Sequence, residues 1–209
     1  MDRNRTLRQW AGLARPAAVK ADKTALLLID LQQGYFTGDK LFIPDGEQAA
    51  ANAARLLCWA RRAGIVVAHI QHKAMKADSP LFAPHSPDID FHELVKPAAG
   101  ETIVSKHLPS SFSGTELQKE LNGRGIETLI LCGLMTHMCV DSTARAALEL
   151  GYKVVVAADA CASRDLPDPN GTATIDRKVV HQTALAALGD RFADILRTEE
   201  IVRLPMGKI

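Results

Sequence analysis

Short apolar runs alternate with longer amphipathic segments along most of this chain, and this alternation restricts the fold more than any other feature. The first run, TALLLID at Thr24–Asp30, is almost continuously hydrophobic, which is typical of a strand buried on both faces of a sheet. The next segment, Gly46–Ala63, has helical apolar spacing and is followed by Gly64, which predicts the end of a helix. Further strands are predicted at residues 65–70, 102–105, 128–132, 153–158 and 192–196, and further helices at 114–122, 137–150 and 173–188.

Strands that alternate with helices are typical of a parallel sheet joined by right-handed crossovers. We therefore predict an α/β fold of three layers, with a doubly wound, mostly parallel sheet and helices on both faces. The 209 residues suit one domain, residues 1–209, whose first part, 1–20, is a surface arm. Residues 71–100 hold four prolines and no sustained period, and we expect a long excursion there.

The charge balance excludes several classes of partner. The chain has 25 Lys and Arg against 24 Asp and Glu, a net charge of +1. Binding to nucleic acid or to a membrane surface needs a basic excess, and none of the apolar runs approaches the ~18 residues that span a bilayer. We therefore expect a small-molecule substrate as the partner, and neither nucleic acid nor membrane.

The sequence of the arm and the pattern of cysteines predict that the protein is located in the cytoplasm. Residues 1–20 are basic, but they lack the apolar core and cleavage site of a secretory signal. A chain of this size does not need disulfides, and none of its cysteines forms a C-x-x-C pair, so a reducing compartment is the better expectation. The four cysteines are Cys58, Cys132, Cys139 and Cys161.

Three reactive side chains are predicted at one edge of the sheet, because ligands of such sheets bind beyond the carboxyl ends of the strands. Asp30 ends the first strand, Lys106 follows the strand at 102–105, and Cys139 lies in the first turn of the helix at 137–150. With Thr136 as its N-cap, this helix is expected to lower the pKa of the Cys139 thiol. An aspartate can take the thiol proton and return it to a leaving amine, and an ammonium keeps that aspartate ionised. These are the groups that acyl transfer requires.

Three segments resemble the isochorismatase-like cysteine hydrolases, a superfamily that includes nicotinamidases and carbamoylsarcosine amidohydrolases. The resemblance runs from about residue 24 to residue 198 and implies that Cys139 is the nucleophile, Asp30 the general base and then acid, and Lys106 their electrostatic partner. It also implies hydrolysis of a small-molecule amide or other C–N bond through a thioester. The segments are LLLIDLQQGYF at 26–36, SKHLPSSFSGTEL at 105–117 and CGLMTHMCVDSTARAALELGYKVVVAADACAS at 132–163.

The resemblance also implies how the substrate is held. The family has a non-proline cis peptide bond before the nucleophile's helix, which here joins Leu134 to Met135, and the N–H groups of Met135 and Cys139 form the oxyanion hole.

Candidates for binding the rest of the substrate are Gln32, Phe36 and His137. Each has a simpler interpretation, because Gln32 can brace Asp30, Phe36 can belong to the core, and His137 can lie in solvent at the start of a helix.

Departures from the family pattern limit the choice of reaction. Nicotinamidases hold a divalent metal with a D-x-H pair near the second strand, whereas this chain has RRAG at 61–64, so we expect no metal and no cofactor. Two alternatives stay open: a vinyl ether hydrolase that needs acid catalysis by Asp30 alone, and a non-catalytic small-molecule-binding scaffold. The presence of Cys139 favours acyl chemistry. Family members are usually oligomers, so we expect a homo-oligomer, either a dimer or a tetramer.

Overall fold

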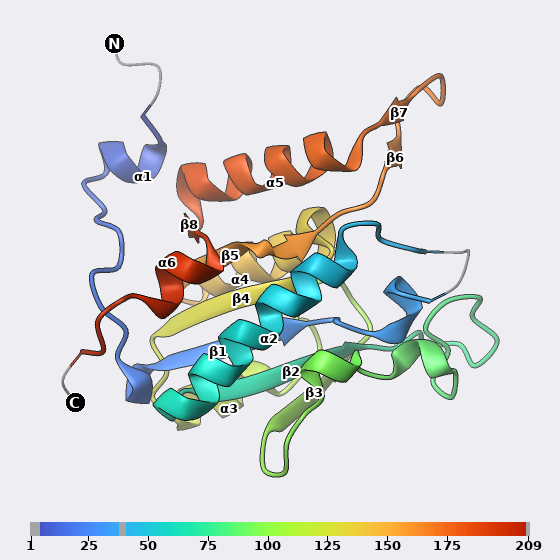
Figure 1. Ribbon diagram of the computed structural model, residues 1–209. Helices are drawn as coiled ribbons and strands as arrows, with labels where there is room; N and C mark the ends of the chain where they lie inside the picture. Colours follow the sequence, from blue (N-terminus) through green and yellow to red (C-terminus); the bar gives the residue numbers. More distant parts are fainter. Residues whose placement is uncertain (1–4, 38–40, 208–209) are drawn as a thin grey trace.

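The structure is a computed structural model, and it describes residues 5–37 and 41–207. Its centre is a parallel sheet with the strand order β3-β2-β1-β4-β5-β8 (Figure 1). All neighbouring strands in this sheet pair in parallel. The strands are β1 (Thr24–Ile29), β2 (Val66–His72), β3 (Thr102–Lys106), β4 (Thr128–Leu134), β5 (Lys153–Ala162) and β8 (Asp194–Leu196).

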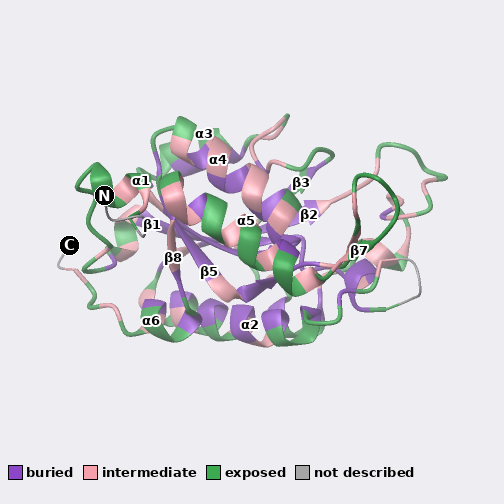
Figure 2. Cartoon of the chain, turned by 90° about the horizontal axis from the view of Figure 1, so that it is seen from above, coloured by how far each residue is buried: buried purple, intermediate pink, exposed green. Residues whose placement is uncertain are grey.

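Helices cover both faces of the sheet, which confirms the predicted three-layer α/β fold. Figure 2 shows one layer of helices, α3, α4 and α5, on one side of the strands, and α2 with the short α6 on the other. The helices are α1 (Leu7–Trp10), α2 (Gly46–Ala63), α3 (Leu117–Gly123), α4 (Asp141–Glu149), α5 (Arg177–Arg191) and α6 (Thr198–Val202). Within the described residues, none of these helices is both long and apolar enough to cross a membrane.

Strand β1 explains why its sequence is apolar at every position. Leu26 and Leu28 belong to the hydrophobic core on the α2 side, whereas Leu27 and Ile29 belong to the core beneath α3 and α4. All six residues of β1 are buried. Each such leucine or isoleucine contributes about 1.5–3 kcal/mol when it is fully buried, so β1 anchors both layers at once.

Three of the predicted helices begin at other residues in the structure. The helix predicted at 114–122 begins at Leu117, as α3. The helix predicted at 173–188 begins at Arg177, because Thr174–Ile175 forms β7, which pairs antiparallel with β6 (Leu166–Pro167). The carboxylate of Asp176 then caps α5 by accepting a hydrogen bond from the Lys178 N–H at 2.7 Å. The helix predicted at 137–150 begins with a π-helical turn at Thr136–Val140 and continues as α4.

The excursion and the arm are also described. Residues 71–100 contain the 3-10 turns Pro87–Ile89 and Glu93–Val95 between longer irregular stretches. The N-terminal arm includes α1, and Arg8 Nη2 pairs with Asp194 Oδ2 of β8 at 2.5 Å. Residues 1–4 of the expected arm lie outside the described residues.

One carboxylate ties the end of α2 to β2 and to the loop before β3. The Glu101 side chain, only 13% exposed, accepts hydrogen bonds from Arg61 Nε and Nη2 at 2.7 and 2.8 Å, and from His69 Nε2 and the Ala98 N–H at 2.8 Å. Burial alone would raise the pKa of Glu101, but the bonds from Arg61, Ala98 and His69 outweigh burial and lower it from 4.5 to about 2.

We predict that Glu101→Gln lowers the free energy of unfolding by about 1–3 kcal/mol, because it removes a charge-assisted network. Glu116→Gln is the control, since that side chain is 78% exposed and pairs with Lys119 on the surface. Because the folded-state pKa of Glu101 is depressed, its contribution is present above pH 4.5 and is lost as pH falls toward about 2. Urea denaturation of the wild-type protein and both variants from pH 7 to pH 3 measures this. If the difference in unfolding free energy between wild type and Glu101→Gln stayed the same across that range, the prediction would be contradicted.

Candidate active site

A close approach between β1 and β4 places the first acid. Ile29 pairs with Gly133, whose φ is +127°, and a Cβ at that glycine would lie 2.0 Å from the Ile29 carbonyl oxygen. Only glycine fits there. The chain then turns at Asp30, which has φ +51° and is 0% exposed. Because the strand order reverses between β1 and β4, Asp30 lies at the crevice where such sheets bind ligands.

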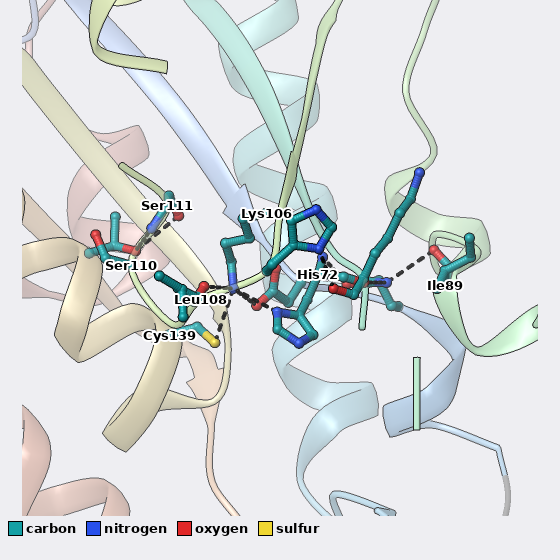
Figure 3. Close-up of polar contacts among 12 residues, drawn as sticks. His72, Ile89, Lys106, Leu108, Ser110, Ser111 and Cys139 are labelled. Carbon is teal, nitrogen blue, oxygen red and sulfur yellow. Dashed lines mark hydrogen bonds and ion pairs between the residues drawn. The ribbon is translucent and has the colours of Figure 1, made fainter. Parts of the chain in front are cut away.

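Lys106 reaches Asp30 from across an intervening strand. Figure 3 shows the Lys106 side chain beside Leu108 and Cys139. Lys106 is the last residue of β3, and β2 separates β3 from β1, a span of about two strand spacings or 9–10 Å. Its Nζ lies 2.7 Å from Asp30 Oδ2 and 3.2 Å from Cys139 Sγ, and it donates to the Leu108 carbonyl oxygen at 3.2 Å. A long basic side chain is therefore needed to join the carboxylate to the sulfur.

Cys139 lies in the π-helical turn that follows β4, and its side chain is directed toward Lys106 (Figure 3). The residue is 3% exposed. The predicted N-cap was wrong: Met135 occupies the cap position, and the Thr136 hydroxyl instead forms a 2.8 Å hydrogen bond with His181 Nδ1. The structure thus brings Asp30, Lys106 and Cys139 together.

The predicted low pKa of the Cys139 thiol was also wrong. Burial, followed by the negative charge of Asp30, raises the pKa of Cys139 to about 12, although Lys106 acts in the opposite direction. The sequence argument considered the helix terminus and the neighbouring ammonium, whereas the structure also buries the sulfur among apolar residues beside the Asp30 carboxylate. The thiol is therefore protonated at neutral pH before a substrate binds.

The ammonium stays charged in this buried setting. Burial lowers the pKa of Lys106, but Asp30 and Cys139 outweigh burial and raise it above its ordinary value. The resting trio is then a neutral thiol, a carboxylate and an ammonium, with no net charge. Moving the proton from sulfur to carboxylate leaves the net charge at zero, which matters because a buried net charge is costly.

The two predicted oxyanion donors lie in the same turn. The peptide bond between Leu134 and Met135 is cis. The Val140 N–H donates a π-type hydrogen bond to the Met135 carbonyl oxygen at 3.2 Å and is the first donor of that type in the turn. The Cys139 N–H lies one residue earlier, among the N–H groups at a helix start that have no partner within the helix. Met135 is 3% exposed and adjoins Thr136 in the chain.

The three predicted substrate-binding residues have different surroundings. Gln32 is 0% exposed and is fully engaged: its Nε2 donates to the carbonyl oxygens of His72 and Ile89, and its Oε1 accepts from the His72 N–H. These are the contacts of a brace, and they leave no amide hydrogen for a substrate. Phe36 packs in the α2-side core, with its ring 4.3 Å from that of His92.

His137 is the third of these residues, and it keeps a free polar atom. Its Nδ1 is 3.0 Å from Ser163 Oγ, and its Nε2 is buried with no hydrogen-bond partner in the described part of the chain. Burial, followed by the charge of Arg164, lowers the pKa of His137. A neutral imidazole with an unused nitrogen can still bind a polar group.

Sequence reasoning missed three residues beside the trio. His72 ends β2 opposite Lys106, with Nδ1 3.5 Å from Lys106 Nζ, and burial followed by that charge lowers its pKa. Burial, then the charges of Asp30 and Cys139, raises the pKa of Tyr35 well above its ordinary value. The Phe82 ring packs against both, with centroids 4.9 Å from Tyr35 and 5.7 Å from His72. The apolar run predicted a strand that ends at residue 70. Strand β2 continues to His72, and this extension is what brings His72 to the site.

The residues that the structure describes contain no group of three or more His, Cys, Asp or Glu arranged to hold a metal ion. Two histidines of β2 and the excursion have other contacts: His72 Nδ1 lies 3.5 Å from Lys106 Nζ, and His92 Nε2 lies 3.3 Å from Glu47 Oε2.

The fold and the buried trio define a class of protein: a hydrolase with a cysteine, an aspartate and a lysine at the carboxyl ends of a parallel sheet. The model of the isochorismatase domain matches residues 24–200, and the chain belongs to the isochorismatase family of hydrolases.

Several relatives are similar over most of the chain. The uncharacterized isochorismatase family protein YddQ of Bacillus subtilis is 38% identical over 180 residues, which cover 86% of this chain and 99% of that protein. Streptothricin hydrolase of Streptomyces noursei is 34% identical over 85% of this chain and 63% of that protein. A crystal structure of an isochorismatase from Pseudomonas putida matches with a TM-score of 0.85 and 33% identity, over 94% of this chain and 98% of that chain.

We predict that Lys106→Met lowers the free energy of unfolding by about 3–5 kcal/mol, because it leaves Asp30 buried without its cation. Adding Asp30→Asn to that variant should restore much of the loss, since it removes the unpaired charge and asparagine tolerates the positive φ. Urea denaturation of the two single variants and the double variant measures the coupling. Additive losses in the double variant would contradict the prediction.

Proposed function

We propose that this protein hydrolyses an amide or related C–N bond of a small molecule through a thioester on Cys139. The observation that carries the proposal is the position of Lys106 Nζ, which contacts the Asp30 carboxylate and the Cys139 sulfur at once inside a buried site. Electrostatic interactions are strong there because water is largely excluded.

The first half of the reaction forms the thioester. Asp30 takes the Cys139 proton as the sulfur attacks the carbonyl carbon, and the N–H groups of Met135 and Cys139 stabilise the oxyanion. Asp30 then gives the proton to the leaving nitrogen, the C–N bond breaks, and the amine departs. Each oxyanion donor is worth roughly 3 kcal/mol of the barrier. The raised pKa of Cys139 supports this role for Asp30, because a protonated thiol needs a base.

The second half regenerates the thiol. Asp30 removes a proton from water, the resulting hydroxide attacks the thioester, and the C–S bond breaks. The sulfur regains the proton from Asp30, and the acid leaves. Lys106 remains charged throughout and holds the carboxylate and the sulfur in place.

Relatives support a C–N bond as the target. Besides streptothricin hydrolase, they include a maleamate amidohydrolase of Pseudomonas putida, 29% identical over 87% of this chain. His137, two residues before Cys139, and Arg164, just after β5, each have a buried nitrogen, Nε2 and Nε, without a hydrogen-bond partner in the described residues. Buried polar groups are usually satisfied, so these atoms suit polar groups of a substrate.

Two alternative functions remain testable. A vinyl ether hydrolase would need Asp30 as an acid and would not need the Cys139 sulfur. A non-catalytic scaffold would bind small molecules without releasing products. The contact between Lys106 and Cys139 favours the amidase, because only a nucleophilic sulfur needs a buried ammonium 3.2 Å away to stabilise its developing negative charge. Neither alternative uses the sulfur in this way.

We predict that primary amides, N-carbamoyl compounds or lactams release ammonia or acid with the wild-type protein. Cys139→Ala should lower kcat by at least about a thousandfold, because it removes the nucleophile. Asp30→Asn should lower it by roughly a hundredfold or more, since the base is lost. Mass spectrometry of the wild-type protein, quenched in turnover, should show the acyl group on Cys139.

Cys58→Ala is the matched control, because Cys58 is an exposed cysteine of α2, and it should keep full activity. Activity on an enol ether that survives Cys139→Ala but not Asp30→Asn would instead establish the vinyl ether hydrolase. Saturable binding with no turnover of any of these compounds would establish the scaffold.

We further propose a homo-oligomer in a reducing compartment. The exposed apolar side chains of the arm, Leu7, Trp10 and Leu13, support self-association, and the four free cysteines support a reducing environment.

Multi-angle light scattering at micromolar concentration should give the mass of a dimer or tetramer, and Trp10→Ser should weaken the assembly. A single species with the mass of one chain would contradict this.

A further inference from the structure

A cavity lies at the open edge of β5, apart from the catalytic trio. Strand β8 pairs with β5 only at Val155–Ala157, and no other described strand covers the outer edge beyond it. A cavity of about 550 Å³ occupies this place, between the first half of α2 and the first turn of α5. Its volume is in the range of small-molecule sites, and none of the trio lines it.

The acidic residues that line this cavity already have partners within the protein. Asp159 Oδ1 accepts hydrogen bonds from the Thr198 N–H and hydroxyl, at 2.7 and 2.8 Å. The other two form ion pairs, Asp45 with Arg177 at 2.7 Å and Glu199 with Arg203 at 2.6 Å.

Three cations that line the cavity are not neutralised in this way. Arg55 comes from α2, Lys178 from α5, and Arg197 from the residue before α6. In the described chain, none of the three has a carboxylate within ion-pair distance. They come from separate parts of the chain and surround one hollow, so their combined field favours an anion of matching size.

One residue joins this cavity to the catalytic loop, which is the turn from Met135 to Val140 that carries Cys139. His181 lines the cavity, and its Nδ1 lies 2.8 Å from the hydroxyl of Thr136, which is 0% exposed. Thr136 directly follows Met135, one of the two oxyanion donors proposed above. A shift of His181 can therefore alter the position of the Met135 N–H without any contact with the substrate.

We propose that this cavity binds a small anion with a carboxylate or phosphate group, and that its occupancy changes the catalytic loop through His181 and Thr136. The argument for anion binding uses only the cavity and its side chains, whereas an effect of the anion on turnover rests on the proposed function. Anion binding and the proposed function can therefore be tested and rejected independently.

Isothermal titration calorimetry with citrate and with inorganic phosphate, at low ionic strength, tests the binding. The double variant Arg55→Gln/Arg197→Gln should weaken the affinity roughly ten- to a hundredfold, because two charge-assisted contacts are lost. Arg62→Gln is the control: Arg62 is also exposed on α2 but does not line the cavity. Comparing the two probes distinguishes carboxylate from phosphate. Equal affinities for all three proteins, or no binding to wild type because a second copy covers the cavity, would overturn the proposal.

Hydrogen exchange measured by mass spectrometry tests the coupling without reference to activity. The bound anion should change the exchange of peptides that span 135–140 in the wild-type protein. In Thr136→Val, which removes the hydroxyl, the affinity should stay within about twofold, but this change should disappear. A change that persists in Thr136→Val, or no change in wild type, would overturn the coupling. Anion binding by a protein that hydrolyses none of the amides would leave this site established and reject the proposed function.

Discussion

The buried contact between Lys106 and Asp30 is the constraint on which the rest of the site depends. Both side chains are 0% exposed, and removing two charges from water costs several kcal/mol for each ion in a protein. Their 2.7 Å contact offsets that cost only if the backbone holds both ends in place. The hydrophobic strand β1 and the Gly133 contact supply this rigidity on one side, and the end of β3 supplies it on the other.

In the proposed mechanism, the same ion pair also determines how the Cys139 thiol loses its proton. A thiolate formed without proton transfer would place two negative charges beside one ammonium in a site that water barely reaches, and the raised pKa of Cys139 expresses that penalty. Passing the proton to Asp30 avoids it. In the proposed mechanism the thiol therefore ionises only as it attacks, which differs from sites in which a helix terminus keeps a permanent thiolate. An unbound enzyme with a neutral thiol is also less prone to oxidation.

The sequence predicted the fold well, because β1, β2, β4 and β5 are buried along most of their length and read as apolar runs with little polar alternation to obscure them. The positions of Asp30, Lys106 and Cys139 followed from the ends of those strands. Side-chain partners did not follow in the same way. Nothing local in the sequence shows that the Thr136 hydroxyl bonds to His181, 45 residues away, instead of capping its own helix.

Three further features needed three-dimensional information. The start of α5 was placed too early, since Thr174–Ile175 pairs with a two-residue strand whose sequence carries no strong strand signal. The elevated pKa of Cys139 depends on how completely the surrounding loops bury it, and position within a helix does not report burial. His72 became part of the site because β2 continues two residues beyond its apolar run.

Two requirements therefore constrain the position of the catalytic loop: the placement of the proposed oxyanion donors and the hydrogen bond of Thr136 to His181. The proposed mechanism requires the N–H groups of Met135 and Cys139 to lie within about 2.7–3.1 Å of a developing oxyanion, so even a displacement of about 1 Å would be costly to the rate. In addition, the Thr136 hydroxyl is held by a histidine at the border of a cationic cavity. A helix that only needed to present a cysteine could have been capped by its own threonine. The Thr136 hydroxyl bonds instead to His181 of α5, a helix that contains none of the three residues of the trio. The geometry of the proposed oxyanion donors therefore depends on the position of the N-terminal part of α5.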